Sequence, residues 1–113
     1  MSRDDAVLLD IAQAAERIGL FIRGMAKDDF LRDLKTQSAV LHQMMIIGEA
    51  AGRLSQGFRD EHADVPWSAI IGMRNILIHE YHHVDLDEVW QAAVRDVPDL
   101  SAQIETLLPV SEE

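Results

Sequence analysis

The sequence contains no cysteine, no long apolar run, and only half as many basic residues as acidic ones. Without cysteine, the chain cannot form a disulfide framework, a thiolate metal site or a cysteine nucleophile, which suits a reducing compartment. No apolar stretch approaches the roughly 20 residues that cross a bilayer, and the N-terminus lacks the basic-then-apolar order of a secretion signal. We therefore expect a cytoplasmic protein with no membrane contact.

The shortage of basic residues gives a formal net charge of −10, from 10 Lys and Arg against 20 Asp and Glu. This charge disfavours a protein that coats DNA or RNA irrespective of sequence, because such binding depends on many phosphate contacts. A nuclease whose few cations line one cleft stays compatible with it, since the local field depends on where charges lie. The acidity is equally compatible with an ordinary solvated surface.

The chain has 113 residues, of which 48% are hydrophobic and 27% charged. This composition is ordinary for a globular fold and excludes a wholly disordered chain. A chain of this length is large enough to bury one core and too short to divide easily into two. We expect a single helical domain over residues 1–113.

Two long apolar patterns occupy the first half of the chain. From Asp4 onward, apolar residues recur every three or four positions and predict a helix over residues 5–25. A second pattern of the same spacing, with Asp28 or Asp29 as its cap, predicts one long helix that continues to Phe58. No segment alternates with a period of two, so a helical fold is expected.

The second half of the chain carries clear signals for helix starts. Pro66 suits a first helical turn, where its missing N–H would be unpaired anyway, and predicts a third helix from there. Asp85 followed by Glu88 has the spacing of a capping arrangement and predicts a fourth helix from Leu86. A kink or restart is expected at Pro98. Together these patterns predict an all-α fold, an antiparallel bundle of four to five helices.

Within the second helical pattern, a stretch of small residues predicts close helix packing. Gly48, Ala51 and Gly52 would allow a neighbouring helix to approach there. Glu49 is the one charge in this stretch, and a carboxylate buried there would need a partner, for which an arginine elsewhere is the obvious candidate.

The third predicted helix divides into a polar stripe and an apolar side. At 100° per residue, Ser68, Gly72, Asn75 and His79 fall within roughly 60° of one another. Arg74 lies instead in the middle of the apolar side, and so does Tyr81. Either Arg74 pairs with a buried acid such as Glu49, or its stem carries the guanidinium round to His79, or that side is an interface.

The sequence around these residues resembles the HepT family of HEPN-domain proteins, and the resemblance covers nearly the whole chain. The resemblance rests on Ile47-Gly48-Glu49-Ala50-Ala51, on Trp67-x-x-Ile70-Ile71-Gly72-Met73-Arg74-Asn75-Ile76-Leu77-Ile78-His79-x-Tyr81, and on Val84-Asp85-Leu86-Asp87-x-Val89-Trp90. Its most specific part is the joint presence of Arg74, Asn75, His79 and Tyr81 with the following Val-Asp-Leu. The His82-His83 pair departs from the pattern, where an aromatic or small residue is expected.

The resemblance implies a HEPN-like bundle that forms a homodimer and cleaves RNA with no metal and no cofactor. Arg74 and His79 match the catalytic pair of the family, and Asn75 matches the polar position that follows the arginine. Tyr81 matches the tyrosine to which a partner, a minimal nucleotidyltransferase antitoxin, attaches AMP. The implied function is an endoribonuclease toxin of a toxin–antitoxin pair similar to types II and VII.

These side chains suit such chemistry. Attack by a ribose 2′-OH needs a group that titrates near neutral pH, which is the range of His79, and a permanent cation such as Arg74 beside the phosphate. Acid–base cleavage uses two proton-transfer groups, whereas each chain offers one well-placed histidine. A dimer that brings two copies together would supply the second.

Two alternatives remain open. His79-Glu80-x-x-His83 satisfies the zinc protease signature, but that signature needs a continuous helix through His83, and the cap at Asp85 implies that the helix has ended by about His82. Adventitious zinc or nickel binding by His79, His82 and His83 is favoured over zinc catalysis. The other is a non-catalytic helical module that binds a nucleotidyltransferase, with Arg74 purely structural.

Overall fold

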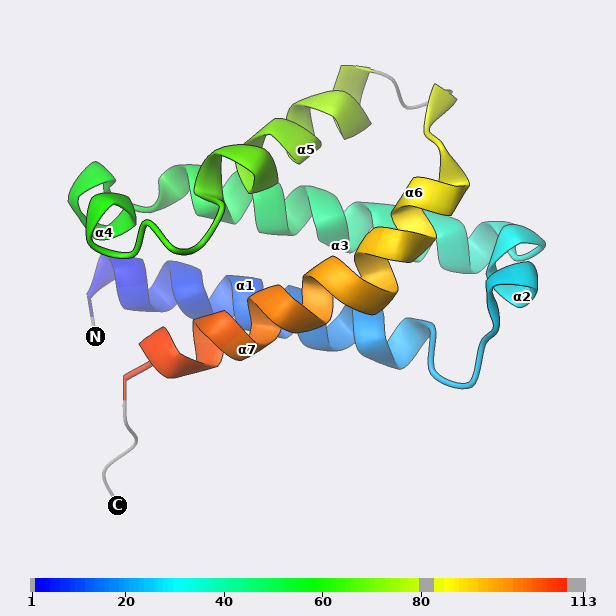
Figure 1. Cartoon of the computed structure of the whole chain (residues 1–113), viewed down its shortest axis with the longest axis horizontal. Coiled ribbons are helices and arrows are strands. Elements are labelled where there is room, and N and C mark those ends of the chain that lie inside the picture. The colour runs from blue at the N-terminus through cyan, green and yellow to red at the C-terminus, as the bar shows by residue number, and fades with distance from the viewer. Residues whose placement is uncertain (1, 80–82, 110–113) are drawn as a thin grey trace.

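A computed structural model describes residues 2–79 and 83–109, apart from the side chains of Ile76, Ile78 and His79. Four longer helices turn back on one another along the chain, as Figure 1 shows. The described residues contain no strand, so the predicted all-α antiparallel bundle is confirmed. The elements are α1 (Arg3–Phe21), α2 (Lys27–Leu31), α3 (Leu34–Arg53), α4 (Gln56–Glu61), α5 (Trp67–His79), α6 (Leu86–Gln91), a π-helical turn η2 (Ala92–Asp96) and α7 (Val97–Leu107).

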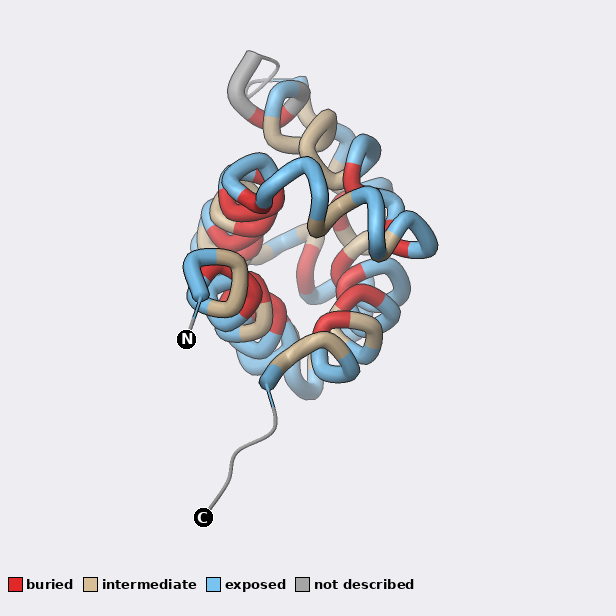
Figure 2. Tube along the Cα trace, turned by 90° about the vertical axis from the view of Figure 1, so that its left-hand side faces the viewer, coloured by how far each residue is buried: buried red, intermediate tan, exposed pale blue. Residues whose placement is uncertain are grey.

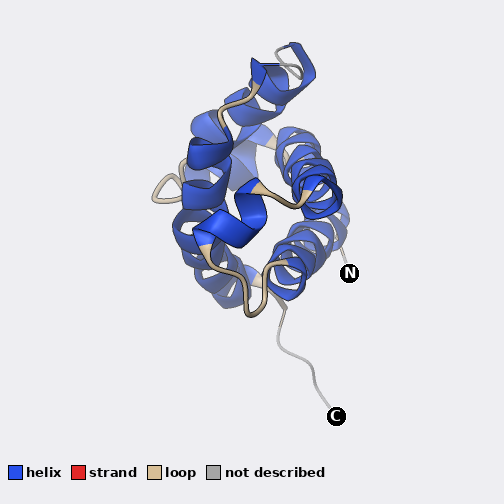
Figure 3. Cartoon of the chain, turned by 90° about the vertical axis from the view of Figure 1, so that its right-hand side faces the viewer, coloured by secondary structure: helices blue, strands red, loops and turns tan. Residues whose placement is uncertain are grey.

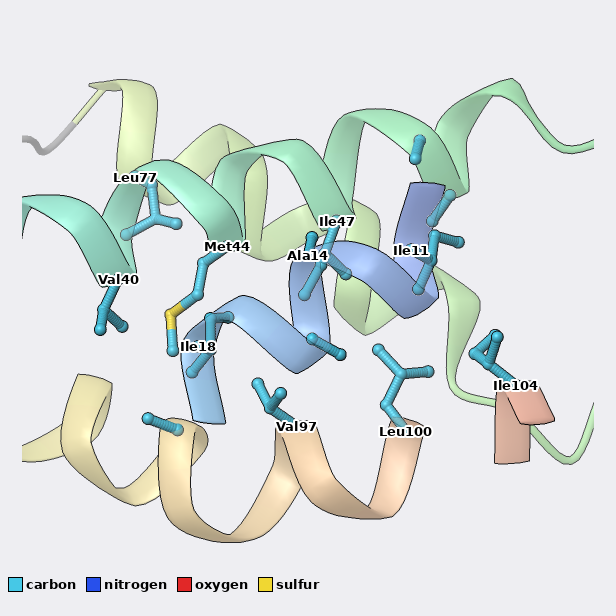
Figure 4. Close-up of a cluster of buried hydrophobic side chains, with 14 of the residues drawn as sticks. Ile11, Ala14, Ile18, Val40, Met44, Ile47, Leu77, Val97, Leu100 and Ile104 are labelled. Atoms are coloured by element: carbon cyan, nitrogen blue, oxygen red, sulfur yellow. The ribbon is translucent and has the colours of Figure 1, made fainter. Parts of the chain in front are cut away.

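The hydrophobic core lies between α1, α3 and α7. Ile11 and Ile18 of α1, Ile47 of α3 and Ile104 of α7 are each 1% exposed or less. Figure 4 shows Ile18, Met44 and Val97 directed into the same space. Buried segments therefore face inward along the long helices, which Figure 2 shows as red stripes on their inner sides.

The first helix is shorter than the predicted 5–25 at its C-terminal end and longer at its start. Ser2 and Asp5 form a capping box, in which the Ser2 Oγ accepts from the Asp5 N–H at 3.1 Å and the Asp5 carboxylate accepts from the Ser2 N–H. The helix ends at Phe21, before Gly24 turns the chain at a φ of 77°. This φ favours glycine, so the chain leaves the helix there although its apolar spacing continues.

The predicted long second helix is wrong, because the chain breaks twice within it. Asp33 caps α3 by accepting from the Thr36 N–H at 3.0 Å, and Ser55 caps α4 by accepting from the Phe58 N–H at 3.2 Å. Leu54 between α3 and α4 is extended, with ψ 143°. The apolar spacing runs across both breaks because all three helices face the same core. Periodicity alone therefore concealed two capping residues.

The cap proposed at Asp28 or Asp29 is also corrected. The residue before α2 is Ala26, and Asp29 in the first turn reaches back to accept from the Ala26 N–H at 2.8 Å. The acid thus supports the start of the helix from its third position.

Three predictions in the second half of the chain are confirmed. Helix α5 begins at Trp67, directly after Pro66. Asp85 caps α6, its Oδ1 accepting from the N–H groups of Asp87 and Glu88 at 2.9 and 3.4 Å. The restart at Pro98 takes the form of η2, a wider turn that precedes α7. Proline cannot donate a backbone hydrogen bond to the preceding turn, which accounts for the irregularity.

Helix α6 is held against α2 at one end of the bundle. The Lys27 Nζ lies 2.6 Å from an Asp87 carboxylate oxygen, and this contact raises the pKa of Lys27. The rings of Phe30 and Trp90 pack at a centroid distance of 5.3 Å. Figure 3 views the molecule from this side. None of the helices described is long and apolar enough to cross a membrane.

Candidate functional site

Helix α5 carries the predicted catalytic residues and is anchored at its N-terminal end. The indole N–H of Trp67 donates to the His62 carbonyl at 2.9 Å, and the side chain is 5% exposed. Its ring also lies 6.3 Å from that of Phe58. Beyond this anchor, α5 packs mainly against α3, and Figure 1 shows it on the outer side of the bundle.

Helix α5 approaches α3 closely at Arg74. A Cβ atom built at Gly48 would lie 2.5 Å from the Arg74 Cβ and 3.1 Å from the Ile70 carbonyl oxygen. Real Cβ atoms do not come so close, so only glycine permits this crossing. The predicted close approach is confirmed at Gly48. It does not extend to Gly52, where an added Cβ would meet nothing within 4 Å.

The proposed pairing of Arg74 with Glu49 is wrong. Glu49 is an exposed residue, and its carboxylate lies 3.7 Å from the guanidinium of Arg53, one turn farther along α3. It follows Gly48 by one residue, which turns its side chain about 100° away from α5. Arg74 itself is partly buried. No carboxylate of the described residues lies within 4.0 Å of its guanidinium.

Asn75 and His79 occupy the same side of α5, one helical turn apart. Asn75 is exposed, and so is Ser68 two turns earlier, whereas Gly72 between them is partly buried. His79 is the last residue of α5, but its side chain lies outside the described residues. The predicted meeting of Arg74 with His79 therefore stays a prediction.

Two other sequence predictions concern positions near the end of α5. Tyr81, the predicted site of AMP attachment, lies outside the described residues together with Glu80 and His82. The helical continuity that the zinc signature requires passes through those positions and is untested. His83 is exposed and precedes the Asp85 cap. The described residues hold no group of three His, Asp or Glu side chains placed to bind a metal.

A groove on the other flank of α5 is a feature that the sequence did not predict. It lies between α5 and the segment formed by α6, η2 and α7, and its central residues include Met73, Ala92 and Asp96. The sequence feature that could have indicated this groove was Met73. This apolar residue lies about 160° around the helix axis from Asn75, on the opposite side of the predicted helix.

Comparison with known proteins gives consistent results. The family model described as "Ribonuclease HepT-like" matches residues 11–107. A protein of Thermococcus cleftensis named "Probable ribonuclease HepT" is 41% identical over 100 residues, which cover 88% of this chain and 91% of the relative. A "Putative RNase" of Caldanaerobacter subterraneus is 36% identical over 98 residues, covering 87% and 88% of the two chains. Another "Putative RNase", of Methanocaldococcus jannaschii, is 34% identical over 107 residues, covering 93% and 98%.

No solved structure matches the chain. The protein is thus a small helical bundle in which an outer helix, α5, carries an arginine at a helix crossing and an exposed asparagine beside it. The chain belongs to the HepT-like ribonuclease family. The resemblance to this family, inferred above from the residues around Arg74, is thereby confirmed.

Proposed function

We propose that the protein is a cytoplasmic, metal-independent endoribonuclease, in which Arg74 binds the scissile phosphate, His79 transfers protons and Asn75 orients the RNA. The observation that supports this most directly is the position of Arg74. Its stem is fixed against Gly48, and no described carboxylate neutralises its guanidinium. A guanidinium that is always charged and whose stem is held in place is well suited to bind a phosphate through two parallel hydrogen bonds. Membership of a ribonuclease family supports RNA as the substrate.

The proposed reaction is an internal transesterification. His79 of one copy removes the proton from a ribose 2′-OH, and the 2′ oxygen forms a bond to phosphorus. The bond from phosphorus to the 5′ oxygen breaks, and that oxygen takes up a proton, which leaves a 2′,3′-cyclic phosphate. Arg74 stabilises the negative charge on the phosphorane oxygens, where a fixed cation has its greatest effect. Histidine serves both proton transfers because its pKa lies near neutral pH.

We propose further that the active species is a homodimer. A single copy offers one histidine in the motif, whereas the reaction needs a base and an acid. In a symmetric dimer each residue is presented twice across the axis, so His79 and its counterpart can divide the two roles. The exposure of Asn75 is compatible with such an arrangement, because that side of α5 is open to a second copy.

Control of the enzyme is proposed to involve a minimal nucleotidyltransferase antitoxin. Transfer of AMP to Tyr81 would place bulk and negative charge two residues from His79, in a site that must accept a phosphate. This would silence a toxin without unfolding it. The proposal depends on the match of Tyr81 to the tyrosine of the family motif.

RNA cleavage in the presence of EDTA tests the catalytic assignment. Wild-type protein and His42→Ala should both cleave, because His42 is an exposed histidine elsewhere on α3, and His79→Ala should be inactive. Loss of wild-type cleavage in chelator would instead favour the zinc interpretation. If folded wild-type protein leaves varied RNAs intact, the non-catalytic binding module replaces the enzyme.

Labelling with radioactive ATP tests the regulatory assignment. A minimal nucleotidyltransferase supplied with ATP labelled on its α-phosphate should label wild-type protein and not Tyr81→Phe. Equal labelling of the two proteins would show that another residue is the acceptor.

A further inference from the structure

The groove on the far flank of α5 consists of two adjoining hollows. One has a volume of about 600 Å³ and the other about 650 Å³, and both are lined by Ala69, Met73, Ala92 and Asp96. Because they share these residues, they form one continuous groove beside α5. It follows this helix from Pro66 to Leu77, which is about three helical turns.

The floor of the groove is apolar. It exposes parts of Ile70 and Met73, which are only partly buried although they face the body of the molecule. They are left uncovered because α5 packs closely on α3 and makes few contacts with α6 and α7. The remaining apolar side chains of the floor and walls include Ile47, Leu77, Val97 and Leu100. An uncovered apolar strip of this length on a small protein is typical of a binding surface.

The rim of the groove is acidic. Asp85 and Glu88 lie at one end, Asp96 in the middle and Asp99 at the other end, and all four are exposed. No lysine or arginine is found among its described lining residues. All four lie on the wall formed by α6 with its cap residue, η2 and α7, so carboxylates follow one side of the apolar strip. This arrangement matches a ligand with cations along one edge of its own apolar strip.

We propose that this groove binds an amphipathic helical segment of a partner protein, with apolar side chains on one face and lysine or arginine along the edge that faces α6, η2 and α7. The length of about three turns and the apolar floor suit a helix lying in a groove. The acidic rim favours a basic edge on the bound helix and repels RNA, whose phosphates would face the same carboxylates.

A second copy of this chain fits the groove less well. Each copy carries a net charge of −10. A twofold dimer with this groove on its axis would bring like carboxylates together, because such an interface pairs a surface with itself. The groove is therefore assigned to a different, basic partner.

The position of η2 gives the groove its shape and its link to the site. Ala92 and Asp96 are the first and last residues of this π-helical turn, and both line the two hollows. Such turns often occur at functional sites. Across the groove is α5, whose opposite side presents Asn75. A bound segment would contact the helix that carries Arg74 without covering the Asn75 side.

Peptide binding to the full-length protein tests the proposal. The probes are two synthetic helices with the same leucine face, one flanked by lysines and the other by glutamates, each followed by fluorescence anisotropy. The lysine probe should saturate, and the glutamate probe should bind at least about tenfold more weakly. Ala69→Trp, which fills the centre of the groove, should abolish binding of the lysine probe.

Charge reversal separates the rim from the general acidity of the protein. Asp96→Lys with Asp99→Lys should weaken the lysine probe roughly tenfold. Glu16→Lys with Glu105→Lys changes the net charge equally, and neither residue lines the groove, so binding should be retained. Circular dichroism verifies that each variant is folded.

Three results would overturn the proposal. One is equal binding of the lysine probe to Ala69→Trp and wild type, and another is equal weakening by both charge-reversal pairs. The third is a wild-type dimer in sedimentation experiments that Ala69→Trp converts to a monomer, because the occupant would then be a second copy. None of these measurements depends on RNA cleavage, so they stand apart from the proposed enzyme activity.

Discussion

Helices α1 and α5 both pack against α3, yet they are built differently. Six side chains of α1 are buried, at 5% exposure or less: Val7, Leu8, Ile11, Ala14, Ala15 and Ile18. Among the described side chains of α5, only Trp67 and Leu77 are buried, and those between them are partly or fully exposed. The first helix packs mainly between α3 and α7, whereas α5 packs mainly against α3.

The difference separates stability from function. A helix covered on two sides contributes apolar burial, which is the main source of folding free energy. A helix covered on one side contributes less, but it leaves polar and apolar side chains available to ligands. The predictions that follow test this division of roles.

The largest expected effect is the loss of a core side chain in α1. Ile18→Ala should lower the free energy of unfolding by about 2–5 kcal/mol, because a fully buried isoleucine leaves a cavity. Met73→Ala in α5 should cost less than about 1 kcal/mol, because that side chain is already partly solvated. Urea unfolding followed by circular dichroism measures both. Equal losses would contradict the distinction between the two helices.

Removal of the Arg74 guanidinium should greatly lower activity and hardly change stability. Arg74→Ala is expected to lower kcat/KM for RNA cleavage roughly 100- to 1,000-fold, the effect of losing one donor to a developing negative charge. The free energy of unfolding should change little, because no described ion pair is broken. Single-turnover cleavage and urea unfolding of the same preparation separate the two quantities. A large loss of stability would indicate a structural role for Arg74.

The two glycines of α3 provide a matched pair at the boundary between the helices. Gly48→Ala should destabilise the fold by about 1–3 kcal/mol, because the new methyl group collides with Arg74. It should also lower cleavage by displacing that residue. Gly52→Ala should be neutral or stabilising by up to about 1 kcal/mol, since alanine favours the helix and meets no neighbour. If both variants behave alike, the crossing at Gly48 is unimportant.

The smallest expected effect concerns the start of α1. The Asp4 carboxylate accepts from the Ser55 N–H at 2.9 Å and from its Oγ at 2.7 Å. The backbone hydrogen bond from Ser55 is the main cause that lowers the pKa of Asp4 below its ordinary value. A lowered pKa gives stability that is present above this value and is lost as the pH falls through the folded-state pKa.

Asp4→Asn should therefore melt slightly below wild type near neutral pH, and the difference should shrink in acid. Thermal melts at several pH values measure this. The effect is small because these hydrogen bonds lie at the solvent-exposed surface, where water screens them. RNA cleavage should be unaffected, because the contact joins α1 to α4 and does not involve α5. A difference that grows in acid would contradict the assigned direction.

Local signals with a chemical cause were predicted well from the sequence. Pro66 and Asp85 marked helix starts because a missing donor and a short acceptor side chain act within one turn. Gly48 was recognised by its lack of a side chain. The breaks at Asp33 and Ser55 were missed because apolar spacing continued across them, although both are good capping residues.

The site itself was predicted in part. The sequence placed Arg74 on the apolar side of its helix, and the structure shows it partly buried against Gly48 of α3, but the proposed partner Glu49 pairs with Arg53. Which residue a side chain meets across two helices depends on their crossing angle and register, which one helix does not encode. The groove was missed for the same reason, since its two walls are separated in sequence.

The positions of the two tryptophans have a spectroscopic consequence. This indole is buried beside Phe58 at the joint between α4 and α5, whereas Trp90 packs on Phe30 at the joint between α2 and α6. The sequence contains no third tryptophan. Replacing one or the other by phenylalanine would leave a single intrinsic fluorophore at a known joint. The protein thus carries two natural reporters, from which separate opening of the two joints can be read without any attached dye.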